Sequence, residues 1–267
     1  MNLEKAIKSI EKQIKDYVGE KKAIIGFSGG IDSTVIAYLC VKALGKENVI
    51  GISMPCTSSD NSNIDVSSSS SVDDAVLIAE ELGVQFKIRN IADVVKAFND
   101  FEKIGTIDEQ NCGLYNGKEI SKLTLGNLMA RVRMVTLYMY ANELNGMVIG
   151  TTNKTEAEIG YYTKYGDGAV DIEPIADLYK TEVWEVAKIL GVPQKIIDKK
   201  PSAELWEGHT DEGEFGMTYQ EMDKILQHKP MTNDEFFESY GEKGKKVLSL
   251  ISASEHKRHM PRAFMVR

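Results

Sequence analysis

The stretch that decides the fold is GFSGGIDST, residues Gly26–Thr34. It places two adjacent glycines between an apolar run, Ala23–Ile25, and a segment with helical character, Val35–Leu39. A strand, a glycine turn and a helix start form the usual phosphate-binding arrangement, because backbone N–H groups and the helix dipole attract an anion. The stretch fits neither the GxxxxGKS/T nor the GxGxxG pattern. It therefore predicts an anion site of another type after the first strand.

An acidic residue, Asp32, stands inside this loop, where its charge alone would repel phosphate. Ser28, Ser33 and Thr34 supply hydroxyl groups beside it. The acid is explained if a cation lies between carboxylate and phosphate, and Mg²⁺ is the hard cation that accompanies nucleotide phosphates. The alternative is simple helix capping, because Ser and Asp favour helix N-termini with or without a ligand. The position directly after the first predicted strand favours binding.

The rest of the chain alternates strand and helix patterns, which predicts βαβ units. The expected fold class is α/β: one domain over residues 1–267, with a parallel sheet flanked by helices on both faces. Strands are expected at Ala23–Phe27, Val49–Met54, Gln85–Ile88 and Met147–Ile149, and helices at Thr34–Leu44, Val72–Leu82, Glu119–Leu144 and Lys180–Leu190.

Several further segments have a recognisable character. Apolar residues at helical spacing in residues 3–17 predict an amphipathic first helix. Residues 151–176 predict a functional loop interrupted by one short helix. Residues 199–217 predict a second loop. We expect its part 202–217 to be mobile without ligand and to close over bound ATP, and the remainder of the chain to be helical up to the tail. The serine run Ser67–Ser71 predicts a surface loop or a helix lead-in, with no function assigned.

Composition argues against several classes of protein. The 267 residues are 42% hydrophobic and 27% charged, which is typical of a soluble globular protein. No apolar run reaches the length of a membrane span, and the N-terminus lacks a signal-peptide core. Three scattered cysteines without a CxxC pair argue against a disulfide framework or a zinc site and favour the reducing cytoplasm. The net charge of −8 argues against a nucleic-acid-binding surface.

The loop Ser28–Ser33 resembles the SGGxDS loop of the N-type ATP pyrophosphatases, which cut ATP between its α and β phosphates. Later stretches resemble the motifs of one branch of that superfamily, the ammonia-dependent NAD(+) synthetases. Two positions depart from the usual motifs: Ser202 stands in place of Thr, and Ile31 in place of Gln. The matching stretches are Asn127–Arg131, Gly150–Glu156, Tyr162–Asp171, Pro174–Lys180, Lys200–Trp206 and Glu255–Arg258.

The resemblance implies a Rossmann-like fold of the adenine nucleotide α-hydrolase type and a specific reaction. Deamido-NAD would be amidated with ammonia at the expense of ATP, through an acyl-adenylate, to give NAD, AMP and pyrophosphate. This reaction is the last step of NAD biosynthesis. A glutamine-using enzyme would need an extra amidase domain with a nucleophilic cysteine, and we expect none here, since no cysteine lies in such a motif.

The resemblance also implies roles for individual residues. Asp32, Glu156 and Lys180 would be catalytic, with Asp32 and Glu156 binding Mg²⁺. Considered alone, Glu156 and Lys180 are better explained as solvated helix residues. The expected ATP-binding residues are Gly26, Phe27, Ser28, Gly29, Gly30, Ile31, Asp32, Ser33, Thr151, Lys180 and Ser202, and the expected deamido-NAD-binding residues are Arg131, Lys164, Asp171, His256 and Lys257.

Two other functions stay open from the sequence. One is a tRNA-thiolating ATP pyrophosphatase, although such enzymes tend to carry catalytic cysteines and basic surfaces. The other is a non-enzymatic nucleotide sensor of the universal-stress type, although such modules lack the later motifs. The long helix predicted around residues 123–144 is apolar on much of its surface, so we expect it to be buried on several sides. A homodimer with the dinucleotide site near its interface would cover it.

Overall fold

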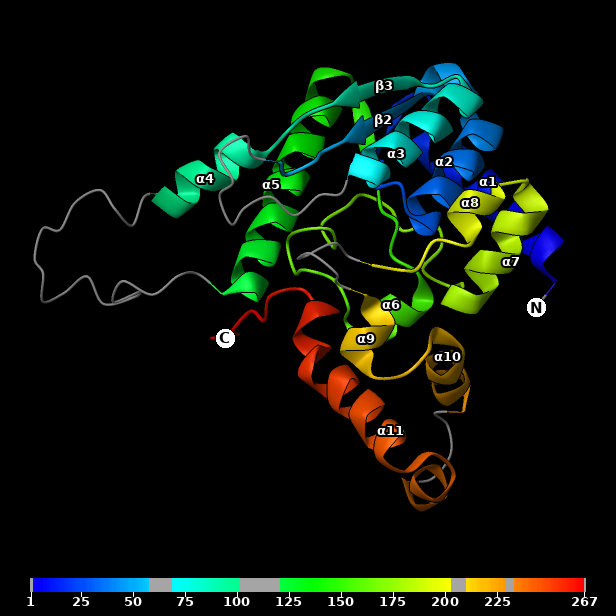
Figure 1. Ribbon diagram of the computed structural model, residues 1–267, viewed down its shortest axis with the longest axis vertical. Coiled ribbons are helices and arrows are strands. Elements are labelled where there is room, and N and C mark those ends of the chain that lie inside the picture. The colour runs from blue at the N-terminus through cyan, green and yellow to red at the C-terminus, as the bar shows by residue number, and fades with distance from the viewer. Residues whose placement is uncertain (1, 58–68, 101–120, 203–209, 229–232, 267) are drawn as a thin grey trace, which may run out of the picture.

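Four parallel strands form the central sheet of the computed structural model (Figure 1). The structure describes residues 2–57, 69–100, 121–202, 210–228 and 233–266. All four strands were predicted from the sequence, each within one residue of its observed ends. They are β1 (Lys22–Gly26), β2 (Val49–Ser53), β3 (Gln85–Ile88) and β4 (Gly146–Ile149), in the spatial order β3-β2-β1-β4.

The strand order reverses at β1. Ile24 of β1 pairs with Ile50 of β2 on one side and with Val148 of β4 on the other. The chain therefore builds the sheet outward from β1 to β3 and returns to add β4 at the opposite edge of β1. In open α/β sheets, ligands bind outside the carboxyl ends of the strands at such a reversal. A ligand site is therefore expected at the carboxyl ends of β1 and β4.

One face of the sheet is covered by α1 (Leu3–Val18), α2 (Ile31–Leu44), α3 (Ser69–Leu82) and α7 (Lys180–Leu190). The amphipathic pattern predicted for α1 is confirmed, since its apolar stripe packs on the body of the protein. Because α1 and α7 both pack on α2, most of α2 is inaccessible to solvent. The α2 helix is thus held firmly at the end of β1.

The opposite face is covered by α5 (Lys122–Glu143) and α4 (Ala92–Asp100). Met129 and Val132 of α5 are buried against the sheet, whereas Val135 and Met139 are exposed. Within one chain α5 is therefore buried on the side that faces the sheet, and its burial on a second side by a partner subunit stays a prediction. The sequence analysis missed α4 altogether; its start is marked by Asn90, whose side chain accepts a hydrogen bond from the Ala92 N–H at 2.9 Å.

A group of helices lies beyond the carboxyl ends of the strands, as Figure 1 shows. We call α6 and α9–α11 the C-terminal cluster, since they share one apolar core. The α11 helix is interrupted at Gly241, whose φ of 50° and ψ of −132° are not helical. The elements after β4 are α6 (Lys154–Ile159), α7, α8 (Gln194–Ile197), α9 (Asp211–Phe215), α10 (Tyr219–Gln227), α11 (Asn233–Ala253) and a 3₁₀ turn (Glu255–Lys257).

Two loop predictions need correction. Residues 199–217 are not wholly a loop, because Asp211–Phe215 forms α9. Three acidic residues lie in the first turn of α9, where their negative charge interacts favourably with the positive end of the helix dipole. Gly216 ends the helix in the left-handed conformation, with a φ of 66°. Part of the serine run, Ser69–Ser71, belongs to α3, and the first two residues of the run lie outside the described residues. Residues 203–209 of the second predicted loop lie outside the described residues as well. The short helix expected within 151–176 is α6.

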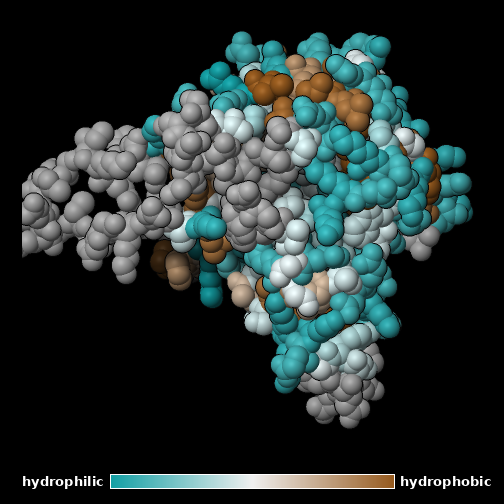
Figure 2. Space-filling model, in the orientation of Figure 1, coloured by the Kyte–Doolittle hydropathy of each residue, from teal (hydrophilic) through white to brown (hydrophobic). Residues whose placement is uncertain are grey.

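The surface seen in Figure 2 is mostly hydrophilic, with apolar atoms gathered over β3. Ile88 in β3 is one of the exposed apolar residues of this edge strand. None of the helices in the described part of the chain combines the length and the apolar character that crossing a membrane requires.

Candidate active site

The turn between β1 and α2 is shaped by one glycine that no other residue could replace without strain. Gly29 has a φ of +73°, and a Cβ atom there would lie 2.3 Å from the carbonyl oxygen of Ser71. The Ser28 and Ser33 hydroxyl oxygens lie 3.0 Å apart, and the Gly30 N–H donates to Ser28 Oγ at 3.2 Å. The turn therefore brings two hydroxyl groups and the N-terminus of α2 together, a combination that suits an anion.

Two of the residues expected to bind ATP have their side chains in the core. The Phe27 ring is buried and lies 5.8 Å from the Phe86 ring, centroid to centroid. Its ring also occupies the space that a Cβ atom on Gly51 would need. Ile31 is buried at the start of α2. Phe27 and Ile31 can therefore offer only backbone atoms to a nucleotide.

Lys180, the first residue of α7, lies between two carboxylates from other elements. Its Nζ atom is 2.5 Å from Asp32 Oδ2 in α2 and 3.4 Å from Glu156 Oε1 in α6. The Lys180 side chain is only 2% exposed, and both acids are largely buried. The structure thus brings together all three residues that the sequence assigned to catalysis, across the ends of β1 and β4.

The ionisation states of Lys180 and Glu156 depend on each other. Burial lowers the pKa of Lys180, but attraction to Asp32 and Glu156 outweighs burial, so its pKa lies above the ordinary value and the amine stays charged. Burial raises the pKa of Glu156 to about 8, against the attraction of Lys180. Two carboxylates face one ammonium, so a further cation would favour the ionised form of both acids.

Asn153 joins the two carboxylates, and the sequence analysis missed it. Its Nδ2 atom donates to Asp32 Oδ1 at 3.0 Å, and its backbone N–H donates to Glu156 Oε2 at 3.2 Å. Its own Oδ1 accepts from the Glu156 N–H at 3.0 Å, which completes a capping box at the start of α6. The signal was present as Asn followed three residues later by Glu.

Lys199 is a second residue that the sequence analysis missed. Its Nζ atom donates to the Gly29 carbonyl oxygen at 3.3 Å, to Ser71 Oγ at 2.8 Å and to Asp74 Oδ2 at 3.0 Å. Asp74 is 3% exposed and also pairs with Lys195 at 2.6 Å. The segment that leads to Ser202 is therefore fastened directly to the turn between β1 and α2.

Four of the five residues expected to bind the dinucleotide lie along one chain of contacts. Arg131 Nη2 donates to the Lys164 carbonyl oxygen at 3.2 Å, and Lys164 Nζ donates to the His256 carbonyl oxygen at 2.5 Å. The next residue, Lys257, donates to the Gly160 carbonyl oxygen at 2.7 Å. Asp171 makes different contacts: it accepts from the Val148 N–H at 2.7 Å and from Tyr138 of α5 at 3.4 Å.

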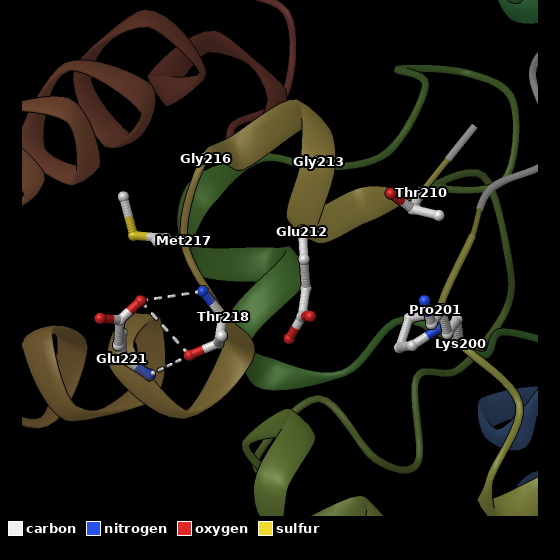
Figure 3. Close-up of a pocket in the computed structure, with 9 residues that line it drawn as sticks. All are labelled: Lys200, Pro201, Thr210, Glu212, Gly213, Gly216, Met217, Thr218 and Glu221. Atoms are coloured by element: carbon white, nitrogen blue, oxygen red, sulfur yellow. Dashed lines mark hydrogen bonds between the residues drawn. The ribbon is translucent and has the colours of Figure 1, made fainter. Parts of the chain in front are cut away.

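The remaining two candidates flank these groups. Thr151 lies two residues after the end of β4 and is partly buried, and Ser202 is partly buried at the end of a described segment. A cavity of about 470 Å³ lies beside the Ser202 segment, between Lys200–Pro201 and the turn from α9 to α10 (Figure 3). Glu212 extends into this cavity, and its carboxylate accepts from the Tyr219 N–H at 2.9 Å. No candidate site residue lines the cavity.

Glu173 closes the space behind the end of β4. Its carboxyl group lies 2.3 Å from the position that a Cβ atom on Gly150 would take, so a larger residue there would displace the Glu173 carboxyl group. Its Oε2 atom accepts from the Thr152 N–H at 3.1 Å. Burial raises the pKa of Glu173 from 4.5 to about 7. The folded protein therefore holds a proton on this residue that the unfolded chain releases.

This raised pKa makes the stability of the protein depend on pH. The folded state binds the Glu173 proton more tightly than the unfolded chain does. The contribution of protonated Glu173 to the free energy of unfolding is therefore complete below pH 4.5 and is lost as pH rises through about 7. Glu173→Gln is expected to be more stable than wild type at pH 8, by on the order of 2–3 kcal/mol, and about equally stable at pH 5.

Urea unfolding of both proteins at the two pH values measures the difference. Glu185→Gln, on the exposed face of α7, is the matched control and should follow wild type at both. The same loss of stability between pH 5 and pH 8 in Glu173→Gln and wild type would contradict the assignment.

Comparison with known proteins agrees with this geometry. Residues 3–261 match the family described as NAD synthase. The chain is 44% identical over 272 aligned residues to the NH(3)-dependent NAD(+) synthetase of Archaeoglobus fulgidus, covering 100% of this chain and 99% of that protein.

Solved structures give the same answer for the fold. The NMN synthetase of Francisella tularensis matches with a TM-score of 0.78 and 34% identity, covering 97% of this chain and 95% of that one. The NH3-dependent NAD synthetase of Campylobacter jejuni matches with a TM-score of 0.76 and 29% identity, covering 99% and 100%. With the motifs in order along the chain and their residues gathered at the reversal of the sheet, the chain belongs to the NAD synthase family.

Proposed function

We propose that this protein is an ammonia-dependent NAD(+) synthetase, a ligase that uses ATP to convert the carboxylate of deamido-NAD into the amide of NAD. One observation carries the proposal: Asp32, Glu156 and Lys180 meet beside the Ser28–Ser33 turn at the ends of β1 and β4. The 44% identity to a relative named NH(3)-dependent NAD(+) synthetase, over the whole chain, supports the same reaction.

The reaction needs two steps because a carboxylate is a poor electrophile. In the first, a nicotinate carboxylate oxygen attacks the α-phosphorus of ATP, and the bond from that phosphorus to the bridging oxygen breaks. Pyrophosphate leaves with the electron pair, and an acyl-adenylate remains. In the second, ammonia attacks the acyl carbon and loses a proton, and AMP leaves with the electrons of the carbon–oxygen bond. No side chain needs to bond covalently to the substrate.

The protein's part in this chemistry is positioning and charge neutralisation. The hydroxyl groups of Ser28 and Ser33 and the N-terminus of α2 suit the departing pyrophosphate. Lys180 keeps its positive charge, because the neighbouring carboxylates raise its pKa. Its ammonium group can therefore stabilise negative charge that develops on the phosphates. Lys199 keeps the turn in place through the Gly29 carbonyl oxygen.

The residues at this site fit a magnesium ion. Asp32 and Glu156 supply hard carboxylate oxygens, and a bound cation would favour the ionised form of both. Phosphate oxygens and water would supply the other ligands, as is usual for Mg²⁺ bound with a nucleotide. A bound Mg²⁺ would neutralise phosphate charge during the first step.

Two nicotinate nucleotides are candidate substrates, the dinucleotide and the mononucleotide. A relative of known structure is named NMN synthetase, so the mononucleotide form of the acid is the competing substrate. The contact chain from Arg131 through Lys164 to His256 and Lys257 supports the dinucleotide, because its basic side chains can bind a second phosphate. A cytoplasmic location is also proposed, supported by the three scattered cysteines.

One assay tests the proposed reaction. Purified protein is mixed with ATP, Mg²⁺ and ammonium, with either deamido-NAD or nicotinate mononucleotide, and NAD, AMP and pyrophosphate are measured. We expect the three products in equal amounts with deamido-NAD, and little activity when glutamine replaces ammonium. Faster amidation of the mononucleotide would overturn the substrate assignment, and pyrophosphate release without amide formation would overturn the reaction.

A second experiment tests the two acids. Asp32→Asn and Glu156→Gln are each expected to lower turnover by at least about 100-fold, the scale of losing an important charge-stabilising group. The loss of turnover in each variant, relative to wild type, should grow as Mg²⁺ becomes limiting. Circular dichroism checks that both variants fold, and the exposed Glu185→Gln on α7 is the control, with turnover unchanged. Turnover close to wild type at limiting Mg²⁺ would exclude the substituted residue as a metal ligand.

We also propose that the protein is a homodimer formed through α5. Val135 is 62% exposed and Met139 and Leu123 are similarly open, on the helix that also carries Arg131. Val135 and Met139 are four residues apart and share one face of the helix, and exposed apolar residues on one face are typical of a self-complementary two-fold contact. Such a contact would bring the dinucleotide residues of α5 close to the partner subunit.

Val135→Glu is expected to convert the dimer into a monomer, because it would bury a charge in the interface. Sedimentation equilibrium at micromolar concentration measures the change, and activity is followed in the same samples. Ile189→Glu is the matched control, since Ile189 is 49% exposed on α7 over the other face of the sheet. A wild-type protein that is monomeric and fully active would rule out the dimer.

A further inference from the structure

The N-terminus of α7 is capped by side chains from two other helices. The first N–H groups of a helix have no partner within it and need one elsewhere. The Lys180 N–H donates to the Thr155 hydroxyl oxygen of α6 at 2.9 Å. The Thr181 N–H donates to Asp223 Oδ2 of α10, also at 2.9 Å. The backbone at Lys180 is therefore fixed by residues outside α7.

Asp223 is the point where these contacts meet. Its second oxygen, Oδ1, accepts a hydrogen bond from the Thr155 hydroxyl at 2.5 Å. Asp223 is 2% exposed and Thr155 is fully buried. One carboxylate thus binds α7 directly through Thr181 and binds it again through Thr155 of α6. Its negative charge also lies at the positive end of the α7 dipole.

The same contacts fix the second acid of the site. Thr155 immediately precedes Glu156, whose carboxylate lies 3.4 Å from Lys180 Nζ. A side chain that holds Thr155 and Thr181 therefore fixes the backbone next to both Glu156 and Lys180. Asp223 itself belongs to α10, which packs on both α6 and α7. It makes no contact with Asp32 among the hydrogen bonds of the described residues.

We propose that Asp223 is a positioning residue: through Thr155 and Thr181 it holds Lys180 and Glu156 at the separation that the reaction needs. The kinetic consequences of this inference rest on the proposed function, whereas the contacts of Asp223 with Thr155 and Thr181 do not depend on it. A displacement of about 1 Å in a catalytic group can slow an enzyme by about 100-fold, so the effect on turnover should be large. The alternative is that Asp223 only stabilises the docking of α10.

The test is a double-mutant cycle between Asp223→Ala and Thr155→Val. Each single variant is expected to lower kcat by at least about 10-fold and to raise the KM for ATP, with the KM for ammonia unchanged. Because both substitutions break the same connection, the double variant should be about as slow as the slower single variant. If the fold losses in kcat of the two single variants multiply in the double variant, the residues act independently and the proposal is overturned.

Two further variants separate positioning from stability. Val247→Ala removes buried apolar contacts from the C-terminal cluster without touching α6 or α7 hydrogen bonds, so it should lower the Tm and leave kcat unchanged at 25 °C. Asp223→Asn keeps an oxygen for the Thr181 N–H and should turn over faster than Asp223→Ala. If Asp223→Ala does not fold, the cycle is run with Asp223→Asn. Wild-type kcat in a folded Asp223 variant would overturn the proposal.

Binding of Mg·ATP gives a readout that does not need turnover. Calorimetry should show Asp223→Ala binding Mg·ATP at least about 5-fold more weakly than wild type, with Val247→Ala equal to wild type. A wild-type protein that binds Mg·ATP but forms no NAD would refute the proposed function alone, and the positioning role would then be judged from this affinity. Equal affinity in wild type and Asp223→Ala would refute the positioning role.

Discussion

The ammonium group of Lys180 between Asp32 and Glu156 is the interaction on which the arrangement of the site depends. It joins α2, α6 and α7, which leave the sheet at different places, across the ends of β1 and β4. Taking three charges out of water is costly, and removing one partner would leave an uncompensated buried charge. The group is therefore held together by what surrounds it, chiefly Asn153 between the two acids and the capped start of α7.

The C-terminal cluster supports this group from the side opposite the sheet. Tyr219 is fully buried in it, its hydroxyl donates to Asp211 at 2.9 Å, and its ring lies 5.1 Å from Lys180 Nζ. Asp223 reaches α6 and α7 from the same helix. Helices late in the chain thus control the geometry of a site whose first residues lie near position 30. With the positioning role proposed for Asp223, the chain's last third would contribute to the chemistry as well as to packing.

Much of the fold was predictable because it rests on local patterns. Buried parallel strands are continuous apolar runs, so their positions were found within one residue. The turn after β1 was predicted because adjacent glycines and hydroxyl residues between a strand and a helix are typical of an anion-binding turn. The α4 and α9 helices were missed because they are short and their apolar periodicity is brief, leaving only capping signals at Asn90 and Gly216.

The sequence by itself determined the strands, the longer helices and the residue types that gather at the end of β1, because each depends on neighbours along the chain. Family motifs added Glu156 and Lys180. Only the tertiary structure decided that Lys180 pairs with two acids, since its partners lie 148 and 24 residues away. Asp223 resembles any helix acid in the sequence; its two hydrogen bonds exist only because α10 packs on α6 and α7, and packing between distant helices leaves no local signal.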